Sequence, residues 1–287
     1  MPWVSKVTIM LIIVLIAAIT MSIITYVPTT TSFSPYNTYG DGLSVFVNDI
    51  GVKPNIVNTD DIGCKVLIVV AEKPLDEDKI NIYENFVAKG GTLIVFDDAG
   101  YTNNLFSKLG LGITIVNKTV LDEVFKEDDR FHVKARYSID SYHGYVILYK
   151  PGFIEISDLT NKRVILYSSS YSYVDMDGNG YYTVGEPIGQ KYLGVEAASG
   201  KGRIIVIADK DIVTNSIIVL ENNTLFTKEL IGQEDTCLDL SELKLGPMDY
   251  LKFHVNKYTT FLGSDYLLAG FLIAVTGVGV YARRRHA

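Results

Sequence analysis

Three short runs of nearly uninterrupted apolar residues constrain the fold of this chain more than any other feature. They are residues 65–71 (KVLIVVA), 92–96 (TLIVF) and 202–208 (GRIIVIA). Such runs are typical of parallel strands that helices bury on both faces. Between the first two runs, the pattern predicts a helix that opens near Pro74 and Asp76 and closes at Gly90. The alternation of strands and helices therefore predicts an α/β fold with a parallel sheet.

A change of pattern near residue 120 indicates a β-rich insertion over residues 120–190. Its apolar segments are short, aromatic and β-branched, as antiparallel strands are. They are residues 131–137, 145–149, 153–156 and 164–167. We therefore expect antiparallel strands inserted into one α/β domain that covers residues 38–232.

Two uncharged stretches stand near the ends of the chain. Residues 7–27 would form a helix of about 31 Å, close to the hydrocarbon thickness of a bilayer. Residues 266–282 form the second stretch, and three arginines follow it at once. We predict a transmembrane signal anchor and a second transmembrane helix. The alternatives are a cleaved signal peptide for the first, and a buried core helix or a sorting signal removed after export for the second.

The basic residues that flank both predicted spans set the expected orientation. The positive-inside rule places Lys6 and the arginines at 283–285 in the cytoplasm, so the segment between the spans would be extracytoplasmic. The expected order is a cytoplasmic end (1–6), a signal anchor (7–27), a linker (28–37), an α/β ectodomain (38–232), a juxtamembrane connection (233–264), a second span (266–282) and a basic cytoplasmic tail (283–287). The predicted localisation is the cell membrane.

The charge of the segment between the predicted spans disfavours one class of partner. It holds all 33 acidic residues but only 22 of the 26 lysines and arginines, which gives a net charge near −11. An acidic surface repels nucleic acid, so we expect no nucleic-acid partner.

Residues 175–186 (DMDGNGYYTVGE) match the twelve-position calcium loop. The expected ligands are side-chain oxygens and, at Tyr181, a backbone carbonyl oxygen. They are Asp175, Asp177, Asn179, Tyr181, Thr183 and Glu186. Gly180 allows the sharp turn at position six. The flanks, 168–174 and 181–184, look like strands, so we expect a structural calcium site in a β setting. The alternative is an acidic, glycine-rich β-turn.

Four aspartates follow two of the predicted parallel strands at their carboxyl ends. They are Asp97, Asp98, Asp209 and Asp211. Ligands of open α/β sheets bind at this edge, so the carboxylates could form an acid/base or metal site there. The alternative is that they cap helices and shape turns. No catalytic histidine or nucleophile motif accompanies them.

The two cysteines, Cys64 and Cys237, leave two interpretations open. They form a disulfide, as an oxidising compartment allows, or they are separate buried thiols.

The chain resembles the class I glutamine-amidotransferase-like fold, which is flavodoxin-like. The resemblance is carried by the strand 65–71, Pro74 and Leu75, FVAKGG at 86–91, TLIV at 92–95, GKGRIIV at 200–206 and residues 209–215. It covers about residues 38–232. The chain is similar to an uncharacterised family of archaeal and bacterial membrane proteins related to the GldG-like subunits of ABC-type transport systems.

The resemblance departs from its family at the catalytic position. Amidotransferases of this fold carry a nucleophilic cysteine after a central strand, whereas residues 97–100 here read DDAG and Cys64 precedes its strand. The resemblance therefore implies a non-catalytic ligand-binding or scaffolding domain. The leading hypothesis is a membrane-anchored extracytoplasmic binding or assembly module, accessory to an ABC-type transporter or surface complex through a membrane-protein partner. The alternatives are a surface hydrolase that uses the four aspartates and a purely structural cell-envelope protein.

Overall fold

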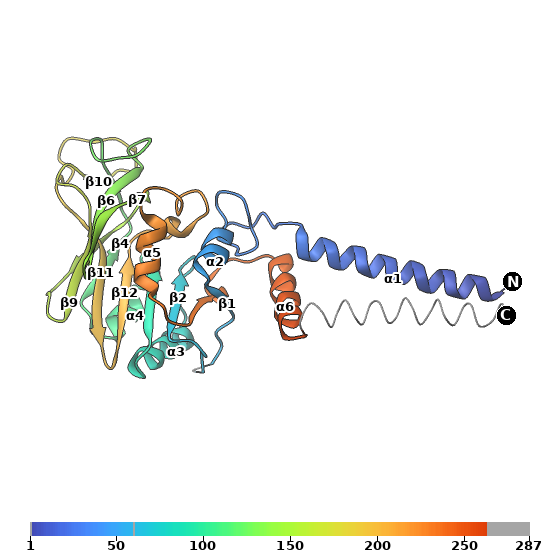
Figure 1. Cartoon of the computed structure of the whole chain (residues 1–287). Helices are drawn as coiled ribbons and strands as arrows, with labels where there is room; N and C mark the ends of the chain where they lie inside the picture. Colours follow the sequence, from blue (N-terminus) through green and yellow to red (C-terminus); the bar gives the residue numbers. More distant parts are fainter. Residues whose placement is uncertain (1, 60, 263–287) are drawn as a thin grey trace. The chain divides into compact units, whose positions relative to one another are not determined.

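A mixed β-sheet forms the centre of Thr30–Leu245, the larger of the two units into which the chain divides (Figure 1). The computed structural model describes residues 2–59 and 61–262. Across the sheet the strands are β1 (Lys53–Asn55), β13 (Thr236–Asp239), β2 (Val66–Val70), β3 (Thr92–Phe96), β12 (Gly202–Ile207), β11 (Tyr192–Ser199), β9 (Lys162–Tyr167), β6 (His132–Ile139) and β7 (Tyr142–Tyr149). The pair β4 (Ile113–Val116) and β8 (Phe153–Ile156) joins the sheet at β11.

The sheet changes from parallel to antiparallel between β12 and β11. The strands β1, β13, β2, β3 and β12 pair in parallel, and the pairs from β12 to β7 are antiparallel. Without β11, the edge of β12 would expose unpaired backbone N–H and C=O groups. The expected parallel sheet with a separate insertion is therefore corrected to one mixed sheet, because the insertion completes that edge.

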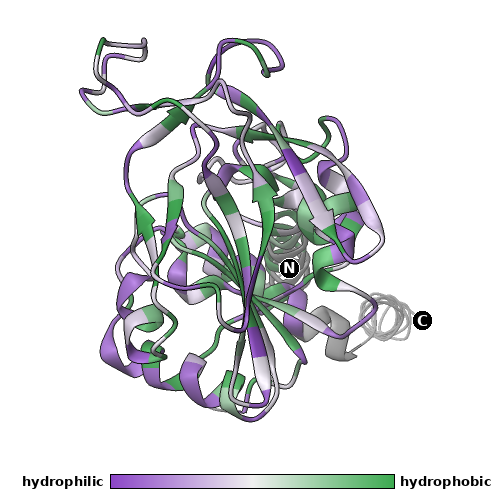
Figure 2. Cartoon of the chain, turned by 90° about the vertical axis from the view of Figure 1, so that its left-hand side faces the viewer, coloured by the Kyte–Doolittle hydropathy of each residue, from purple (hydrophilic) through white to green (hydrophobic). Residues whose placement is uncertain are grey.

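Helices cover both faces of the parallel strands. One buried cluster joins Leu67, Leu93 and Ile204 of the strands to residues of α3 (Glu77–Ala88) and α4 (Asn103–Lys108). On the other face, Phe96 of β3 meets Phe46 of α2 (Ser44–Ile50) edge to face, with ring centroids 6.4 Å apart. Helix α5 (Asn223–Ile231) adds Phe226, which packs on β6 through Tyr137. In Figure 2 the central strands are mostly hydrophobic, whereas the outer helices alternate hydrophobic and hydrophilic residues.

Helix α3 begins and ends where the sequence predicts. The carboxylate of Asp76 accepts a hydrogen bond from the backbone N–H of Lys79 at 2.8 Å, which caps the first turn. After the helix, Gly90 has φ +107°, a backbone conformation that favours glycine. Gly202 at the start of β12 also needs its small size, because a Cβ there would lie 2.2 Å from the carbonyl oxygen of Gly91.

The expected juxtamembrane connection, residues 233–264, contains elements of the central fold. Strand β13 lies between β1 and β2, and the short helix η2 (Leu240–Glu242) follows it. Elsewhere, β5 (Thr119–Leu121) and β10 (Tyr173–Asp175) pair in a separate two-stranded sheet. This small sheet holds the amino-terminal end of the loop 175–186.

The smaller unit contains α1 (Pro2–Tyr26) and α6 (Pro247–Leu262). Within it, the ammonium group of Lys252 donates to the carbonyl oxygens of Ile24 and Thr25 at the end of α1. A cation there complements the negative end of the helix dipole. Burial lowers the pKa of Lys252, and Asp249 opposes that change.

The prediction of membrane spans is corrected. Among the residues that the structure describes, no helix combines the length and the apolar character needed to cross a membrane. Residues 7–27 fall almost entirely within α1, whereas residues 266–282 lie outside the described residues. The first span was inferred from missing charge, which alone does not establish that a helix crosses a membrane. The signal anchor, the cell-membrane localisation, the extracytoplasmic domain and the cytoplasmic termini are withdrawn with this finding.

Candidate functional site

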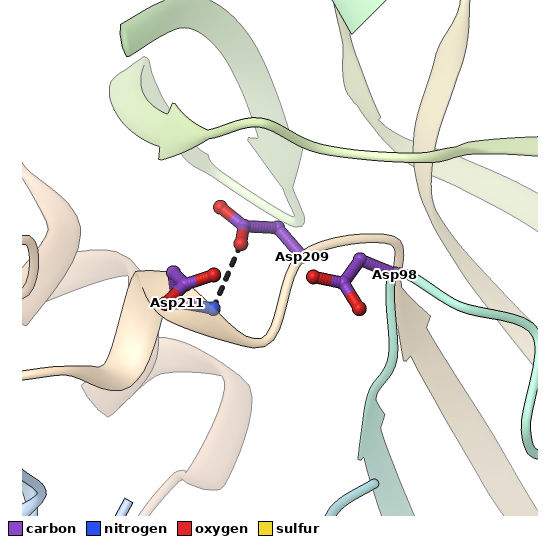
Figure 3. Close-up of side chains that lie close together, drawn as sticks. All are labelled: Asp98, Asp209 and Asp211. Atoms are coloured by element: carbon purple, nitrogen blue, oxygen red, sulfur yellow. Dashed lines mark hydrogen bonds between the residues drawn. The ribbon is translucent and has the colours of Figure 1, made fainter. Parts of the chain in front are cut away.

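Three of the four predicted edge aspartates meet at the carboxyl ends of β3 and β12. Asp98 follows β3, Asp209 follows β12, and Asp211 begins the short helix η1 (Asp211–Val213). One carboxylate oxygen from each lies within 4.8 Å of the others. Figure 3 shows the three side chains close together. The convergence follows from topology, because β3 and β12 are parallel neighbours and end at the same edge.

Asp97 does not join this group. Its buried carboxylate accepts four hydrogen bonds, from the backbone N–H groups of Ala99, Gly100 and Thr102 and from the hydroxyl of Thr102, at 2.7–2.9 Å. These bonds shape the turn that leads into α4. Asp97 therefore has the turn-forming role that was the alternative interpretation for all four aspartates.

Asp209 also has a structural task within the group. It is fully buried, and it accepts hydrogen bonds from the backbone N–H of Tyr149 at 2.9 Å and from that of Asp211 at 2.8 Å. Asp98 instead pairs with Lys210, with its Oδ1 3.1 Å from Nζ. Among the described residues, the carboxyl group of Asp211 has the fewest hydrogen-bond and ion-pair partners of the three.

Burial and mutual repulsion shift the acidities of this group. Burial, and then the carboxylate of Asp211, raises the pKa of Asp209 well above its ordinary value. Burial and Asp98 raise the pKa of Asp211 to about 6, although Lys210 and Lys150 pull it down. Burial likewise raises the pKa of Glu72 nearby. Such clustered, perturbed carboxyl groups occur both at functional sites and in structural networks.

The second acidic group is the loop 175–186, where the structure brings together Asp175, Asp177 and Glu186. One oxygen from each carboxylate lies within 4.8 Å of the others. Asp175 and Glu186 are buried, and Asp177 is exposed. Backbone N–H groups of the loop hold the carboxylates: Gly180 donates to Asp175 at 2.8 Å, and Met176 donates to Glu186 at 2.7 Å.

The other predicted calcium ligands lie in the same loop. The amide of Asn179 and the hydroxyl of Thr183 both donate to Oδ2 of Asp177, at 2.9 and 3.0 Å. The hydrogen bond from the N–H of Asn179 and that from the hydroxyl of Thr183 lower the pKa of Asp177. Tyr181 lies in the same turn, and its backbone N–H donates to Oδ1 of Asn179 at 2.7 Å.

The backbone of the loop has the conformation that position six of a calcium loop requires. Gly180 has φ +78°, in the left-handed region that favours glycine, and a Cβ there would lie 3.1 Å from the ring of Phe131. Of the two expected flanking strands, 168–174 contributes only the start of β10 (Tyr173–Asp175), and 181–184 form a bend, irregular backbone and a turn. The N–H of Thr183 donates to Glu186 at 2.9 Å, which closes the loop on itself and prevents strand pairing there.

Basic side chains near the loop bind its carbonyl oxygens instead of its carboxylates. Arg130 donates to the carbonyl of Gly180 at 3.1 Å, and Lys118 donates to that of Met176 at 2.8 Å. Within the described part of the chain, no ion pair includes the carboxylates of Asp175, Asp177 or Glu186. The three carboxylates therefore converge without an ion-pair partner among the described residues, although two basic side chains contact the loop backbone.

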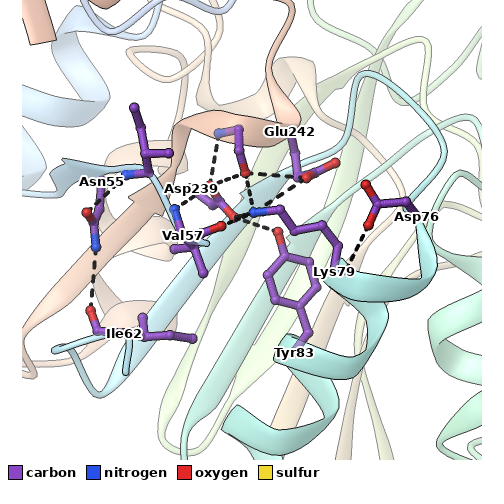
Figure 4. Close-up of polar contacts among 10 residues, drawn as sticks. Asn55, Val57, Ile62, Asp76, Lys79, Tyr83, Asp239 and Glu242 are labelled. Atoms are coloured by element: carbon purple, nitrogen blue, oxygen red, sulfur yellow. Dashed lines mark hydrogen bonds and ion pairs between the residues drawn. The ribbon is translucent and has the colours of Figure 1, made fainter. Parts of the chain in front are cut away.

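A buried polar network joins α3 to β13 and η2, and sequence reasoning did not identify it (Figure 4). At its centre, Asp239 accepts from Lys79 at 3.1 Å and from the hydroxyl of Tyr83 at 2.7 Å. Ser241 donates to the other oxygen of Asp239 at 2.6 Å, and Glu242 lies 3.9 Å from the ammonium of Lys79. Lys79 pairs with both carboxylates, so the network ties α3 to β13 and η2, and we assign it a structural role.

The two cysteines form a disulfide. Cys64 and Cys237 are bonded, with Cα atoms 6.1 Å apart and a sequence separation of 173. Cys64 precedes β2, so it lies at the end of the strand opposite to the carboxyl edge. Neither cysteine is therefore a free thiol placed at the position of an amidotransferase nucleophile.

A cavity of about 670 Å³ lies between the β4–β8 pair and the start of β11. Its lining residues are Gly112, Thr114, Phe153, Ile154, Glu155, Ile156, Ser157, Gln190, Lys191 and Tyr192. None of them belongs to either acidic group. The cavity therefore does not place a substrate against the edge aspartates.

A family model described as a domain of unknown function, DUF4350, matches residues 54–231. No curated protein matches the chain. Similar solved structures include the mmIFT52 N-terminal domain, which is 13% identical with a TM-score of 0.47 over 61% of this chain and 82% of that one.

Two further structures show how weak these similarities are. A cytoplasmic protein from Salmonella typhimurium LT2 is 12% identical, with a TM-score of 0.37 over 63% of this chain and 75% of that one. Alpha-L-fucosidase isoenzyme 2 from Paenibacillus thiaminolyticus is 20% identical, with a TM-score of 0.37 over 59% of this chain and 25% of that enzyme. The chain thus spans about a quarter of the length of that glycosidase. With TM-scores below 0.5, these similarities support no conclusion about activity.

Proposed function

The chain belongs to the family defined by the domain of unknown function DUF4350, and from that premise we propose that it is a non-catalytic binding or assembly module whose β-rich insertion is organised by calcium. The observation that carries the proposal is the convergence of Asp175, Asp177 and Glu186 without an ionic partner among the described residues. Like charges held together repel one another unless a cation neutralises them. A bound divalent cation would remove that repulsion and stabilise the loop.

The donor set of the loop favours calcium over other divalent ions. Its expected ligand atoms are all oxygens, from carboxylates, an amide, a hydroxyl and a backbone carbonyl, and calcium binds six to eight such oxygens in flexible geometry. Zinc prefers nitrogen and sulfur ligands, and the loop contains neither histidine nor cysteine. Magnesium demands near-ideal octahedral geometry and keeps several of its waters, so a loop that supplies all its ligands from protein atoms is poorly suited to it.

Two observations support the non-catalytic part of the proposal. The position after β3 carries Asp97 and Asp98 instead of a cysteine, and Cys64 is held in a disulfide. From the sequence resemblance, we further propose kinship with GldG-like accessory subunits, which would make the ligand another protein of a transport or surface complex.

The experiment that tests the proposal is thermal melting of the full chain with calcium or with chelator. We expect calcium to raise the melting temperature, because a ligand that binds only the folded state stabilises it. The substitutions Asp177→Asn and Glu186→Gln should abolish the increase. Asp158→Asn, which changes an exposed carboxylate in another loop of the insertion, should retain it. Equal melting temperatures with and without calcium would show that the segment is only an acidic turn.

A second candidate function is hydrolysis at the carboxyl edge of the sheet. The observation that favours it is the meeting of Asp98, Asp209 and Asp211, with the pKa of Asp211 raised to about 6, where a carboxyl group can serve as a general acid or base. The test is a panel of chromogenic phosphate and carboxylic esters, assayed with and without magnesium or manganese. Turnover that Asp211→Asn removes, and that Asp177→Asn leaves intact, would establish this function in place of the first.

A further inference from the structure

Large apolar side chains gather in solvent at one end of the insertion. In Thr30–Leu245, fourteen large hydrophobic residues among those described are exposed, and eight of them fall in two loop segments, 123–131 and 171–188. They are Val124, Phe125, Tyr171, Met176, Tyr181, Tyr182, Val184 and Ile188. We call this set the distal face; it adjoins β10 (Figure 1). Single exposed apolar residues are ordinary, but a cluster marks an interaction site.

Contacts between the two segments make the distal face continuous. The rings of Phe125 and Tyr171 stack with centroids 6.2 Å apart. The guanidinium of Arg130 lies 4.0 Å from the centre of the Tyr181 ring while it also donates to Gly180. These contacts tie the segment 123–131 to the acidic loop and to the residues before it. The exposed rings are therefore held in place by neighbours instead of extending singly into solvent.

The composition of the distal face is that of a protein-binding surface. Tyrosine, phenylalanine and methionine are enriched at the centres of protein interfaces, where their large area is buried at low entropic cost. Three of the eight members are tyrosines, and Val184 in the acidic loop is 93% exposed. A side chain so exposed contributes nothing to the core of this chain, and a partner that covers it would gain its full apolar area.

Charge identifies the kind of partner. The segments 118–131 and 171–190 contain eight acidic and three basic residues, a net charge of −5, and one calcium ion would leave −3. Facing copies of this surface would repel each other, and nucleic acid would be repelled as well. A protein segment that combines basic side chains with apolar anchors complements both the charge and the exposed rings.

Calcium would control this surface, so the inference rests on the proposed function. Tyr181 is itself an expected ligand through its backbone carbonyl, Tyr182 and Val184 each stand next to a ligand position, and Ile188 follows the last ligand, Glu186. Neutralising the three carboxylates would hold these side chains in one arrangement. Pre-organised contact groups bind more tightly than groups that must be ordered on binding.

We propose that the distal face is a calcium-dependent docking surface for a basic, amphipathic segment of a partner protein. Three fluorescent peptides of equal length test it by anisotropy with the calcium-loaded full chain. One peptide combines lysine and leucine, the second replaces lysine by glutamate, and the third replaces leucine by serine. We expect the lysine–leucine peptide to bind most tightly and to lose about tenfold in affinity when a chelator is added.

Variants locate the binding surface. The double variant Val184→Ser with Ile188→Ser should bind the lysine–leucine peptide about tenfold more weakly, because it loses two apolar anchors. Glu127 and Asp128 are exposed acidic residues. The double variant Glu127→Lys with Asp128→Lys should also bind the lysine–leucine peptide more weakly than the wild type does, and most clearly at low salt. Leu159→Ser is the matched control, because Leu159 is 56% exposed in the loop at the other end of β9. That substitution should leave binding unchanged.

Several results would overturn the inference. Equal binding of the glutamate–leucine peptide would show apolar adhesion alone, and equal binding of the lysine–serine peptide would show charge alone. Self-association in sedimentation that Val184→Ser removes would identify a second copy as the occupant. Calorimetry with calcium alone separates the two proposals. Bound calcium without peptide binding refutes the docking surface, whereas peptide binding without bound calcium refutes the proposed function.

Discussion

The side chain of Asn223 supplies both backbone hydrogen bonds of Ile147. The N–H of Ile147 donates to Oδ1 of Asn223 at 2.8 Å, and Nδ2 of Asn223 donates to the carbonyl oxygen of Ile147 at 2.8 Å. One amide at the start of α5 thus imitates a neighbouring strand along the outer edge of β7. Asp209 continues this cover through the N–H of Tyr149. An edge strand that is covered in this way is protected from pairing with another chain.

Replacing Asn223 should therefore destabilise the fold strongly. Asn223→Ala removes both bonds to Ile147 and the bond from Nδ2 to the carbonyl of Ile217, and it leaves buried polar groups unsatisfied. We expect the free energy of unfolding to fall by about 2–4 kcal/mol in a urea titration. Asn222→Ala, which removes an exposed bond to the carbonyl of Tyr145, should cost below about 1 kcal/mol. Equal losses in the two variants would contradict this account of the edge.

The buried network around Asp239 predicts a large difference between two lysines. Lys79→Met leaves the carboxylates of Asp239 and Glu242 buried without their cation, and we expect a loss of about 3–5 kcal/mol. Lys53→Ala breaks an exposed pair with Asp235 and should cost at most about 1 kcal/mol. Guanidinium unfolding of both variants measures the difference. A Lys79 variant as stable as the Lys53 variant would exclude the network as a major contributor to stability.

Asp211 predicts a specific pH dependence of stability. Its pKa is about 6 in the folded chain and 3.8 in the ordinary reference state, so the folded chain binds more protons between these values. The contribution of Asp211 to stability is therefore favourable at low pH and is lost as the pH rises from about 4 to 6. As the pH rises across this range, the free energy of unfolding of Asp211→Asn should increase by on the order of 2–3 kcal/mol relative to that of the wild type.

The measurement for Asp211 is a pair of urea titrations at several pH values between 4 and 7. Asp140→Asn is the control, because Arg163 holds the pKa of Asp140 below its ordinary value, so this change should shift the profile in the opposite direction. Parallel stability profiles of the wild type and Asp211→Asn would show that Asp211 is not perturbed in the folded chain.

Reduction of the Cys64–Cys237 disulfide should weaken the larger unit. The bond joins residues with a sequence separation of 173. In the chain-entropy model, closing so long a loop in the unfolded chain stabilises the folded state by about 5 kcal/mol. We expect dithiothreitol to lower the melting temperature of the wild type. The double variant Cys64→Ser with Cys237→Ser should melt low with or without the reductant. A wild type unaffected by reduction would mean that the disulfide adds no stability.

The local features of the fold could be predicted from the sequence. Strands β2, β3 and β12 lie where continuous apolar runs occur, because a strand buried on both faces has no polar side to interrupt the run. The placement of Asp98, Asp209 and Asp211 at one edge also follows from sequence, since neighbouring parallel strands end together. The structure further brings Asp175, Asp177 and Glu186 together, as their spacing predicts.

The features that depend on distant partners could not be predicted. Strand β13 is only Thr236–Asp239, within a polar segment, and its place is set by pairing with β1 and β2. Lys79 has the sequence signature of a solvated helix residue, and only the distant Asp239 explains its burial. Asn223 likewise resembles an ordinary helix-start residue until Ile147 is placed beside it. The predicted signal anchor failed for a different reason, because the absence of charge alone does not establish that a helix crosses a membrane.

Calcium binding by the loop 175–186 is the central claim, and isothermal titration calorimetry of the full chain with calcium tests it most directly. We predict one calcium ion per chain, binding that magnesium at equal concentration does not prevent, and complete loss of the heat signal in Glu186→Gln. Asp158→Asn should bind as the wild type does. No binding at millimolar calcium, or binding that Glu186→Gln leaves unchanged, would contradict the account.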